Sequence, residues 1–192
     1  MGAWHAAPPF FLPFMIIEDI PHYFAKEILV LGCGNILYGD DGFGPAVADD
    51  LNLNYEIPGN AAILNLGLST RGFMFDLLLN EKHPRRIVIA DAMTCDNRRP
   101  GDVFEVPLDG IIREKVDDFS LHQGPTSNLL KELRDFCGVD IVIVACQPFN
   151  IPKEMEGGLT GPVRKAVRVA SQLIYDKYIL ENMQSPDTGL QK

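Results

Sequence analysis

The chain has 192 residues, of which 46% are hydrophobic and 22% charged, and its formal net charge is −9. This length and composition predict a globular protein with one domain and a substantial core. The negative charge argues against nucleic acid or an anionic membrane as a partner, because a polyanion binds a basic face.

Residues 1–26 contain the apolar run AAPPFFLPFMII, but prolines interrupt this run and no basic segment precedes it. They contain no apolar span of about 18 residues, so they fit neither a signal peptide nor a membrane helix. We predict an N-terminal extension over residues 1–26, one domain over 27–181 and a polar C-terminal tail over 182–192. The four cysteines show no C-x-x-C spacing, which predicts reduced thiols and a cytoplasmic protein rather than a disulfide framework or a structural zinc site.

Apolar runs alternate with helical patterns along the domain. The runs predict buried strands at Ile28–Cys33, Ala61–Leu66, Arg86–Asp91 and Val139–Cys146, with an edge strand at Asp102–Pro107. Helices are predicted at Gly44–Leu53, Arg71–Leu79, Pro125–Phe136 and Pro162–Leu180. Strands that are apolar on both faces and separated by helices predict an α/β fold. We expect a three-layer α/β/α sandwich with a twisted, mostly parallel central sheet.

Three acids and a histidine follow the predicted strands or precede a predicted helix. Asp40 and Asp41 follow the first strand, Asp91 ends the third, and His122 precedes the third helix. Ligands bind outside the carboxyl ends of such strands, so we expect these residues at one rim. Asp41, Asp91 and His122 suit a divalent metal that polarises a carbonyl or activates a water. Without a metal, two carboxylates suit acid–base catalysis, and the alternative is that the acids only cap helices or turns.

A nucleotide-binding function receives little support. The turn GCGNIL has the first two glycines of a dinucleotide-binding motif, but Leu37 stands where the third glycine belongs. The second predicted strand ends in Asn65-Leu66 without the acid that binds a ribose. No P-loop motif is present.

Four segments resemble a known family in their order and spacing. ILVLGCGNILYGDDGFG, IVIADAM, SLHQG and GGLTGPV, within residues 27 to about 180, resemble the hydrogenase maturation endopeptidases. The resemblance implies a protease that removes a C-terminal peptide from the large-subunit precursor of a [NiFe] hydrogenase after nickel insertion. The family's metal triad corresponds to Asp41, Asp91 and His122. The resemblance implies that the metal is the precursor's own nickel and that the site also accepts ions such as cadmium or zinc.

Two departures from the family pattern point to a subgroup. Many members carry Glu where Asp41 stands, and many carry D-G-G-T-x-G where this chain has Asn65 to Gly72. Together with the extra N-terminal residues, these departures suggest the members that process deazaflavin-reducing hydrogenases of methanogens.

The predicted catalytic residues are Asp40, Asp41, Asp91 and His122. A carboxylate such as Asp40, or the metal, would activate the attacking water, and N–H groups of the turn Gly32–Asn35 would stabilise the oxyanion. Two alternatives stay open: a nonproteolytic, metal-dependent chaperone of the precursor, and another small α/β hydrolase, such as a peptidyl-tRNA hydrolase-like enzyme. The net charge counts against a tRNA substrate.

Overall fold

A five-stranded sheet forms the centre of the protein in a computed structural model that describes residues 20–108 and 126–180. The strand order is β2-β1-β3-β5-β4. The parallel strands are β1 (Ile28–Cys33), β2 (Ala61–Gly67), β3 (Arg86–Ala92) and β5 (Asp140–Cys146). The strand β4 (Val103–Pro107) lies at the edge of the sheet, as the alternation of its sequence predicted, and it pairs antiparallel with β5.

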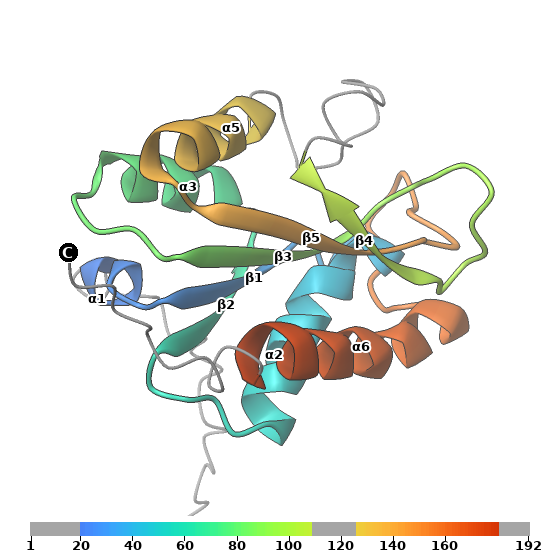
Figure 1. The fold of residues 1–192 in the computed structure, drawn as a ribbon. Helices are drawn as coiled ribbons and strands as arrows, with labels where there is room; N and C mark the ends of the chain where they lie inside the picture. Colours follow the sequence, from blue (N-terminus) through green and yellow to red (C-terminus); the bar gives the residue numbers. More distant parts are fainter. Residues whose placement is uncertain (1–19, 109–125, 181–192) are drawn as a thin grey trace, which may run out of the picture.

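Helices cover both faces of this sheet (Figure 1). One face carries α2 (Phe43–Asn54) and α6 (Gly161–Ile174), and α6 continues into a π-helical turn, η3 (Tyr175–Leu180). The other face carries α3 (Thr70–Leu79) and α5 (Thr126–Cys137). The predicted three-layer α/β/α sandwich is therefore confirmed. Within residues 20–108 and 126–180, the structure contains no helix with the length and hydropathy needed to span a membrane.

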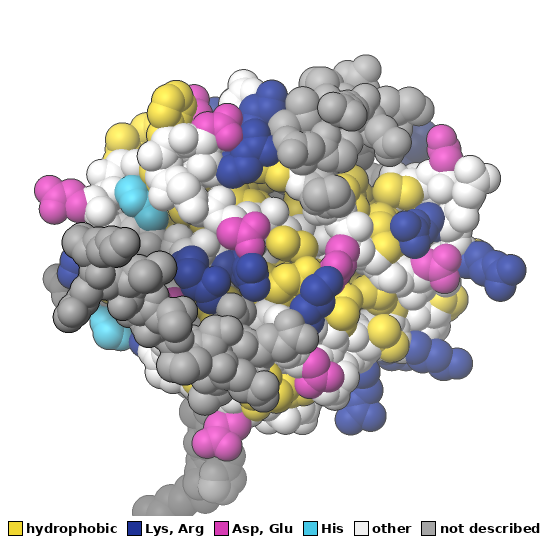
Figure 2. Space-filling view, viewed as in Figure 1, with side chains coloured by type: hydrophobic (Ala, Val, Ile, Leu, Met, Phe, Trp, Pro, Cys, Tyr) yellow, Lys and Arg dark blue, Asp and Glu magenta, His cyan; other side chains and the backbone are white. Residues whose placement is uncertain are grey.

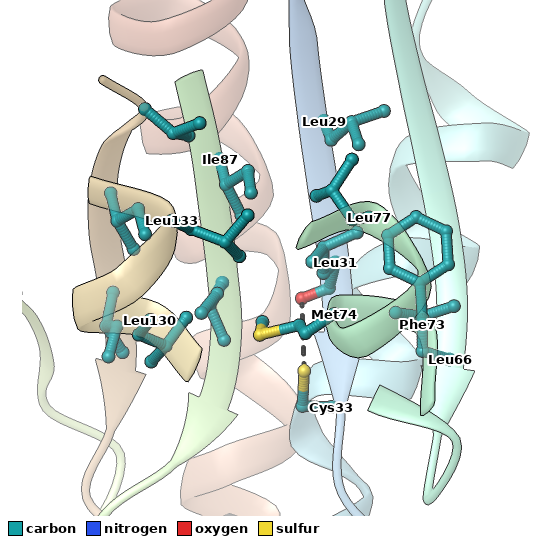
Figure 3. Packing of buried hydrophobic residues seen from close by; sticks show 14 of the residues in the cluster. Leu29, Leu31, Cys33, Leu66, Phe73, Met74, Leu77, Ile87, Leu130 and Leu133 are labelled. Atoms are coloured by element: carbon teal, nitrogen blue, oxygen red, sulfur yellow. Dashed lines mark hydrogen bonds between the residues drawn. The ribbon is translucent and has the colours of Figure 1, made fainter. Parts of the chain in front are cut away.

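Burial on both faces explains why the central strands have continuous apolar sequences. All six residues of β1 are buried. Leu29 and Leu31 pack toward α3 and α5, where Leu31 lies near Met74 (Figure 3), whereas Ile28 and Val30 pack on the opposite side. A strand with two buried faces gains burial free energy from every side chain, so the period-two alternation of a half-exposed strand is lost.

Gly44 lets the start of α2 approach the sheet closely. A Cβ at this position would lie 2.2 Å from the carbonyl oxygens of both Ala90 and Cys33, a distance that only glycine avoids. The short 3-10 helix η2 (Gly39–Gly42) directly precedes α2, and it is therefore held near the carboxyl ends of β1 and β3. The two predicted acids of the first motif lie in η2.

The helix α1 (Ile20–Phe24) falls within the predicted N-terminal extension. The Phe24 side chain is nevertheless buried in the core, and its ring centroid lies 5.3 Å from that of Phe73. The end of the predicted extension thus packs against the domain, a contact that no pattern in this segment predicts. The predicted tail, 182–192, lies outside the described residues.

Both charge signs occur on the molecular surface. On the face shown in Figure 2, acidic and basic side chains are interspersed and separated by hydrophobic ones. This face therefore offers no uniformly basic surface of the kind that binds a polyanion.

Candidate active site

Three of the four predicted site residues lie at the carboxyl ends of the parallel strands. Asp40 and Asp41 lie in η2 after β1, Asp91 is the penultimate residue of β3, and all three are buried. His122 lies outside the described residues. It precedes α5, which leads back to the start of β5 and so begins toward the same edge of the sheet as the acids.

The turn after β1 wraps around Asp41. The Asn35 N–H donates to Asp41 Oδ2 at 2.8 Å. Gly34 has a φ of +123°, and a Cβ there would lie 2.0 Å from the Asp41 carbonyl oxygen and 3.6 Å from Asp91 Oδ1. A glycine is required at this position because it lies between the two acids in a backbone conformation that other residues rarely adopt.

These contacts correct the predicted oxyanion role of the same turn. The Gly34 N–H donates to the Gly67 carbonyl at 3.3 Å, while the Asn35 N–H is bonded to Asp41. Both donors already have acceptors within the protein. The glycines of this turn therefore permit a tight turn of the backbone. The N–H groups of Gly34 and Asn35 are not available to a substrate oxygen.

Asp91 lies within the electrostatic influence of Asp41. Burial, and then the charge of Asp41, raise the pKa of the Asp91 carboxyl well above its usual value, while the Ala92 N–H that donates to Asp91 Oδ1 at 2.9 Å acts in the opposite direction. A buried pair of carboxylates resists full ionisation unless a proton or a cation lies between them. The pair therefore suits either a shared proton or a bound divalent cation.

The two described acids fit a metal but do not complete a site. Carboxylate oxygens bind divalent ions, and Asp41 and Asp91 would supply two ligands. Within residues 20–108 and 126–180, no group of three histidine, cysteine or acidic side chains is placed to hold a metal. A third ligand at His122 stays a prediction.

Asp40 has a different environment although it is adjacent to Asp41. Its carboxylate accepts bonds from the Phe149 N–H at 2.8 Å, the Asn150 N–H at 2.9 Å, and the Thr160 N–H and Oγ1 at 2.7 and 2.9 Å. The residue that caps α2 is Gly42, without a side-chain bond. These contacts favour a positioning role for Asp40 that joins η2 to the loop after β5. The role as a water-activating base stays a prediction.

A buried thiol lies beside the acid pair. The Thr70 hydroxyl donates to Cys33 Sγ at 3.2 Å, and burial followed by the charge of Asp91 raises the pKa of this thiol. Cys146 is also buried, and burial followed by the charges of Asp40 and Asp102 raises its pKa to about 12. Neither thiol is suited to be a nucleophile, because the thiolate is the reactive form. All four cysteines are free, as predicted.

Asn65 occupies the position where the family pattern has an acid. Its side-chain amide donates to Asp49 Oδ1 at 3.0 Å, which joins the end of β2 to α2. Asn65 therefore makes a contact between a strand and a helix, and no acid projects from this strand end.

Sequence reasoning identified the acids but missed the residues that hold them. Thr160 lies in the conspicuous GGLTGP segment, yet its pairing with Asp40 spans 120 residues. Thr70 is the first residue of α3, and it belongs to none of the motifs identified in the sequence. No sequence pattern predicts a contact between residues so far apart in the chain. The strand pattern did predict that the carboxyl ends of the parallel strands lie at one edge of the sheet.

Comparisons with known proteins agree with the predicted family and fold. The family model described as hydrogenase maturation protease matches residues 45–177, a range that includes Asp91 and His122 and begins after Asp41. A protein from Methanocaldococcus jannaschii that is described as a hydrogenase maturation protease is 33% identical to this chain over 151 residues. The match covers 78% of this chain and 94% of that protein. The delta subunit of coenzyme F420 hydrogenase from Methanothermobacter thermautotrophicus is 36% identical over 160 residues, 79% of this chain and 94% of that protein.

Solved structures show the same fold. The [NiFe] hydrogenase maturation protease HycI from Thermococcus kodakarensis superposes with a TM-score of 0.64 at 23% identity and covers 85% of this chain and 99% of its own. The maturating endopeptidase HybD from E. coli gives a TM-score of 0.60 at 24% identity and covers 78% of this chain and 90% of its own. The α/β layers around the acid pair are therefore an architecture shared with these enzymes.

Proposed function

The chain belongs to the hydrogenase maturation protease family, and we propose that it removes the C-terminal peptide of a nickel-loaded [NiFe] hydrogenase large-subunit precursor. The observation that supports this function best is the buried pair Asp41 and Asp91, in which the charge of one raises the pKa of the other. Such a pair is unfavourable when both acids are ionised, and a cation relieves it. The precursor's nickel is a cation that would reach the site only with its substrate.

The pair thereby makes recognition depend on the metal. Both carboxylates must be ionised to bind nickel, so nickel displaces the proton that the paired acids favour. His122 is proposed as the third ligand. When the precursor lacks nickel, Asp41 and Asp91 still repel each other, and the precursor lacks the contact that would orient its C-terminal segment.

Cleavage itself is the hydrolysis of one peptide bond beside the nickel. The oxygen of a water molecule forms a bond to the scissile carbonyl carbon, the carbon–nitrogen bond breaks, and a proton from the water ends on the departing amine. The chain's contribution is to orient the bond, since positioning alone accelerates such a reaction by a large factor. Asp40 would support this by holding η2 against the loop after β5.

The substrate we propose is the large subunit of a hydrogenase that reduces coenzyme F420. The similarity to the delta subunit of coenzyme F420 hydrogenase, at 36% identity over most of both chains, supports this choice. It agrees with the subgroup suggested by the replaced turn at Asn65. A direct comparison of precursors, one F420-reducing and one not, would show faster processing of the former.

Intact mass spectrometry tests the function. The nickel-loaded precursor is incubated with the wild-type protein, with Asp91→Asn and with Asp41→Asn. We expect loss of a defined C-terminal fragment with the wild type and no loss with either variant, because an amide cannot replace an anionic ligand. Asp76→Asn, which changes an exposed acid on α3, is the matched control and should process normally.

Other outcomes separate the alternatives. Normal processing by both Asp41→Asn and Asp91→Asn would contradict the role of the acid pair. A stable, nickel-dependent complex with unchanged precursor mass would indicate the chaperone instead.

A further inference from the structure

Five apolar side chains are exposed on two loops beside the acid pair. Two follow β1 and three follow β5, and the carboxyl ends of both strands lie at the same edge of the sheet. The exposed fractions are 61% for Ile36, 48% for Leu37, 67% for Phe149, 39% for Ile151 and 73% for Met155. We call these five residues the apolar platform.

The two loops that carry the platform are bonded to each other. The Glu156 N–H donates to the Leu37 carbonyl at 3.0 Å, and the Gly39 N–H donates to the Glu156 carbonyl at 2.8 Å. Tyr38 and Glu156 thus form an isolated parallel bridge. The backbone of the platform is therefore fixed by hydrogen bonds before any partner arrives.

Asp40 strengthens the same connection. Its carboxylate accepts the N–H groups of Phe149 and Asn150, and its own N–H donates to the Asn150 carbonyl at 3.1 Å. Phe149 is a platform residue whose backbone is held by a buried charge. A buried carboxylate with several donors is a costly feature to maintain for a loop with no function, because its removal from water must be compensated.

We propose that the apolar platform is the docking surface for an apolar segment of the hydrogenase large-subunit precursor, an inference that rests on the proposed function. Continuity with the acid pair supports this occupant. The loop of Ile36 and Leu37 runs directly into Asp41, so a polypeptide that reaches Asp41 and Asp91 passes beside these side chains.

The chemistry of the platform agrees with a protein partner. Phenylalanine and methionine are enriched at protein interfaces, whose rims are polar. The exposed charges of Lys153, Glu154 and Glu156, on the same loop, suit such a rim. A prefixed backbone reduces the ordering entropy that binding costs. The platform would supply affinity that does not depend on the metal, while the acid pair supplies selectivity for the nickel-loaded state.

Substitution of the two most exposed platform residues tests the proposal. The double variant Phe149→Ser/Met155→Ser removes apolar area without filling or emptying the core. We expect binding of the nickel-loaded precursor to weaken by about tenfold or more, the usual loss at an interface hot spot. Cleavage at saturating precursor should persist, because Asp41 and Asp91 are unchanged. Biolayer interferometry and the concentration dependence of cleavage measure the two effects.

A matched control lies at the opposite edge of the sheet. Phe136 and Leu79 are 83% and 69% exposed and lie near the C-terminal ends of α5 and α3, which precede the amino ends of β5 and β3. Phe136→Ser/Leu79→Ser should bind and cleave like the wild type. Phe149→Leu should recover most of the affinity that Phe149→Ser loses, and thermal unfolding verifies that each variant folds.

Each result is decisive. Equal precursor affinity of the wild type and the platform variant, with cleavage intact, would overturn the platform and leave the proposed function standing. Loss of a dimer in light scattering, with precursor affinity unchanged, would assign the platform to a second copy of this chain and also overturn it. A wild-type protein that neither binds nor cleaves the precursor would overturn the proposed function, and the platform with it.

Discussion

Asp40 and Asp91 are both buried carboxylates at the same edge of the sheet, yet their charges are compensated differently. Asp40 accepts bonds from four donors, which come from Phe149, Asn150 and Thr160. The hydrogen bond that the structure records for the Asp91 carboxylate, within the described part of the chain, comes from the adjacent Ala92 N–H. Asp91 instead has the like charge of Asp41 nearby, and its pKa is raised.

The difference indicates a structural contribution from Asp40 and agrees with the functional role proposed for Asp91. Donors that are built into the fold stabilise a charge permanently, so Asp40 contributes to the stability of the protein. The like charge of Asp41 disfavours the ionised form of Asp91 unless a cation binds between the two acids. Perturbed acids of this second kind are typical of functional sites.

The largest expected difference between Asp40 and Asp91 is in stability when each acid is neutralised in turn. Asp40→Asn should lower the free energy of unfolding by about 3 kcal/mol, since it removes the charge that buried donors require. Asp91→Asn should leave that free energy unchanged or raise it, because it relieves repulsion with Asp41. Urea denaturation of both variants measures the difference, and Asp76→Asn is the neutral control. An equal loss of stability in both variants would show that the two acids do not differ as described.

The pH dependence of stability gives a smaller effect. The folded pKa of Asp91 is raised above its usual value of 3.8, so the folded protein binds this proton more tightly than the unfolded chain does. The stabilisation from this proton is complete below the unfolded pKa and is lost as pH rises through the folded pKa. The slope is limited to about 1.4 kcal/mol per pH unit for one proton.

We therefore expect the difference in unfolding free energy between the wild type and Asp91→Asn to shift against the wild type as pH rises from about 4. Denaturation at several pH values measures this difference, in which contributions from other groups such as Glu105 cancel. A difference that stays constant over this range would mean that Asp91 ionises normally in the folded protein.

The sheet and its acidic rim could be predicted from the sequence because both follow from local patterns. Apolar runs such as Ile28–Cys33 identified buried strands, and the shared direction of parallel strands was enough to put Asp41 and Asp91 at one edge. The bounds of the strands differ from the predicted ones by a residue at most.

The environments of the individual acids were not predictable in the same way. Asp40 and Asp41 are neighbours in a DD pair, and the family resemblance assigned Asp41 to the metal triad with Asp91. No local pattern predicts that loops hold Asp40. The distinction arises from contacts with Thr160 and Gly34, which depend on how the loops close after the sheet has formed. Phe24 was missed for a similar reason, because a single aromatic residue in an apolar segment has no period to reveal its packing.

The smallest expected change in stability comes from removing one hydrogen-bond donor to Asp40. Thr160→Val keeps the backbone N–H that donates to Asp40 Oδ1 and removes only the hydroxyl that donates to Oδ2 at 2.9 Å. We expect the free energy of unfolding to fall by about 1 kcal/mol, the net value of one hydrogen bond. Thr160→Ser keeps the hydroxyl and is the control. Its free energy of unfolding should differ from that of the wild type by about 0.5 kcal/mol or less. In Asp40→Asn the hydroxyl has lost its anionic acceptor, so adding Thr160→Val to that variant should cost less than it costs the wild type. This non-additivity is what a direct interaction produces, and simple addition of the two losses would show that Thr160 acts on stability by a route other than Asp40.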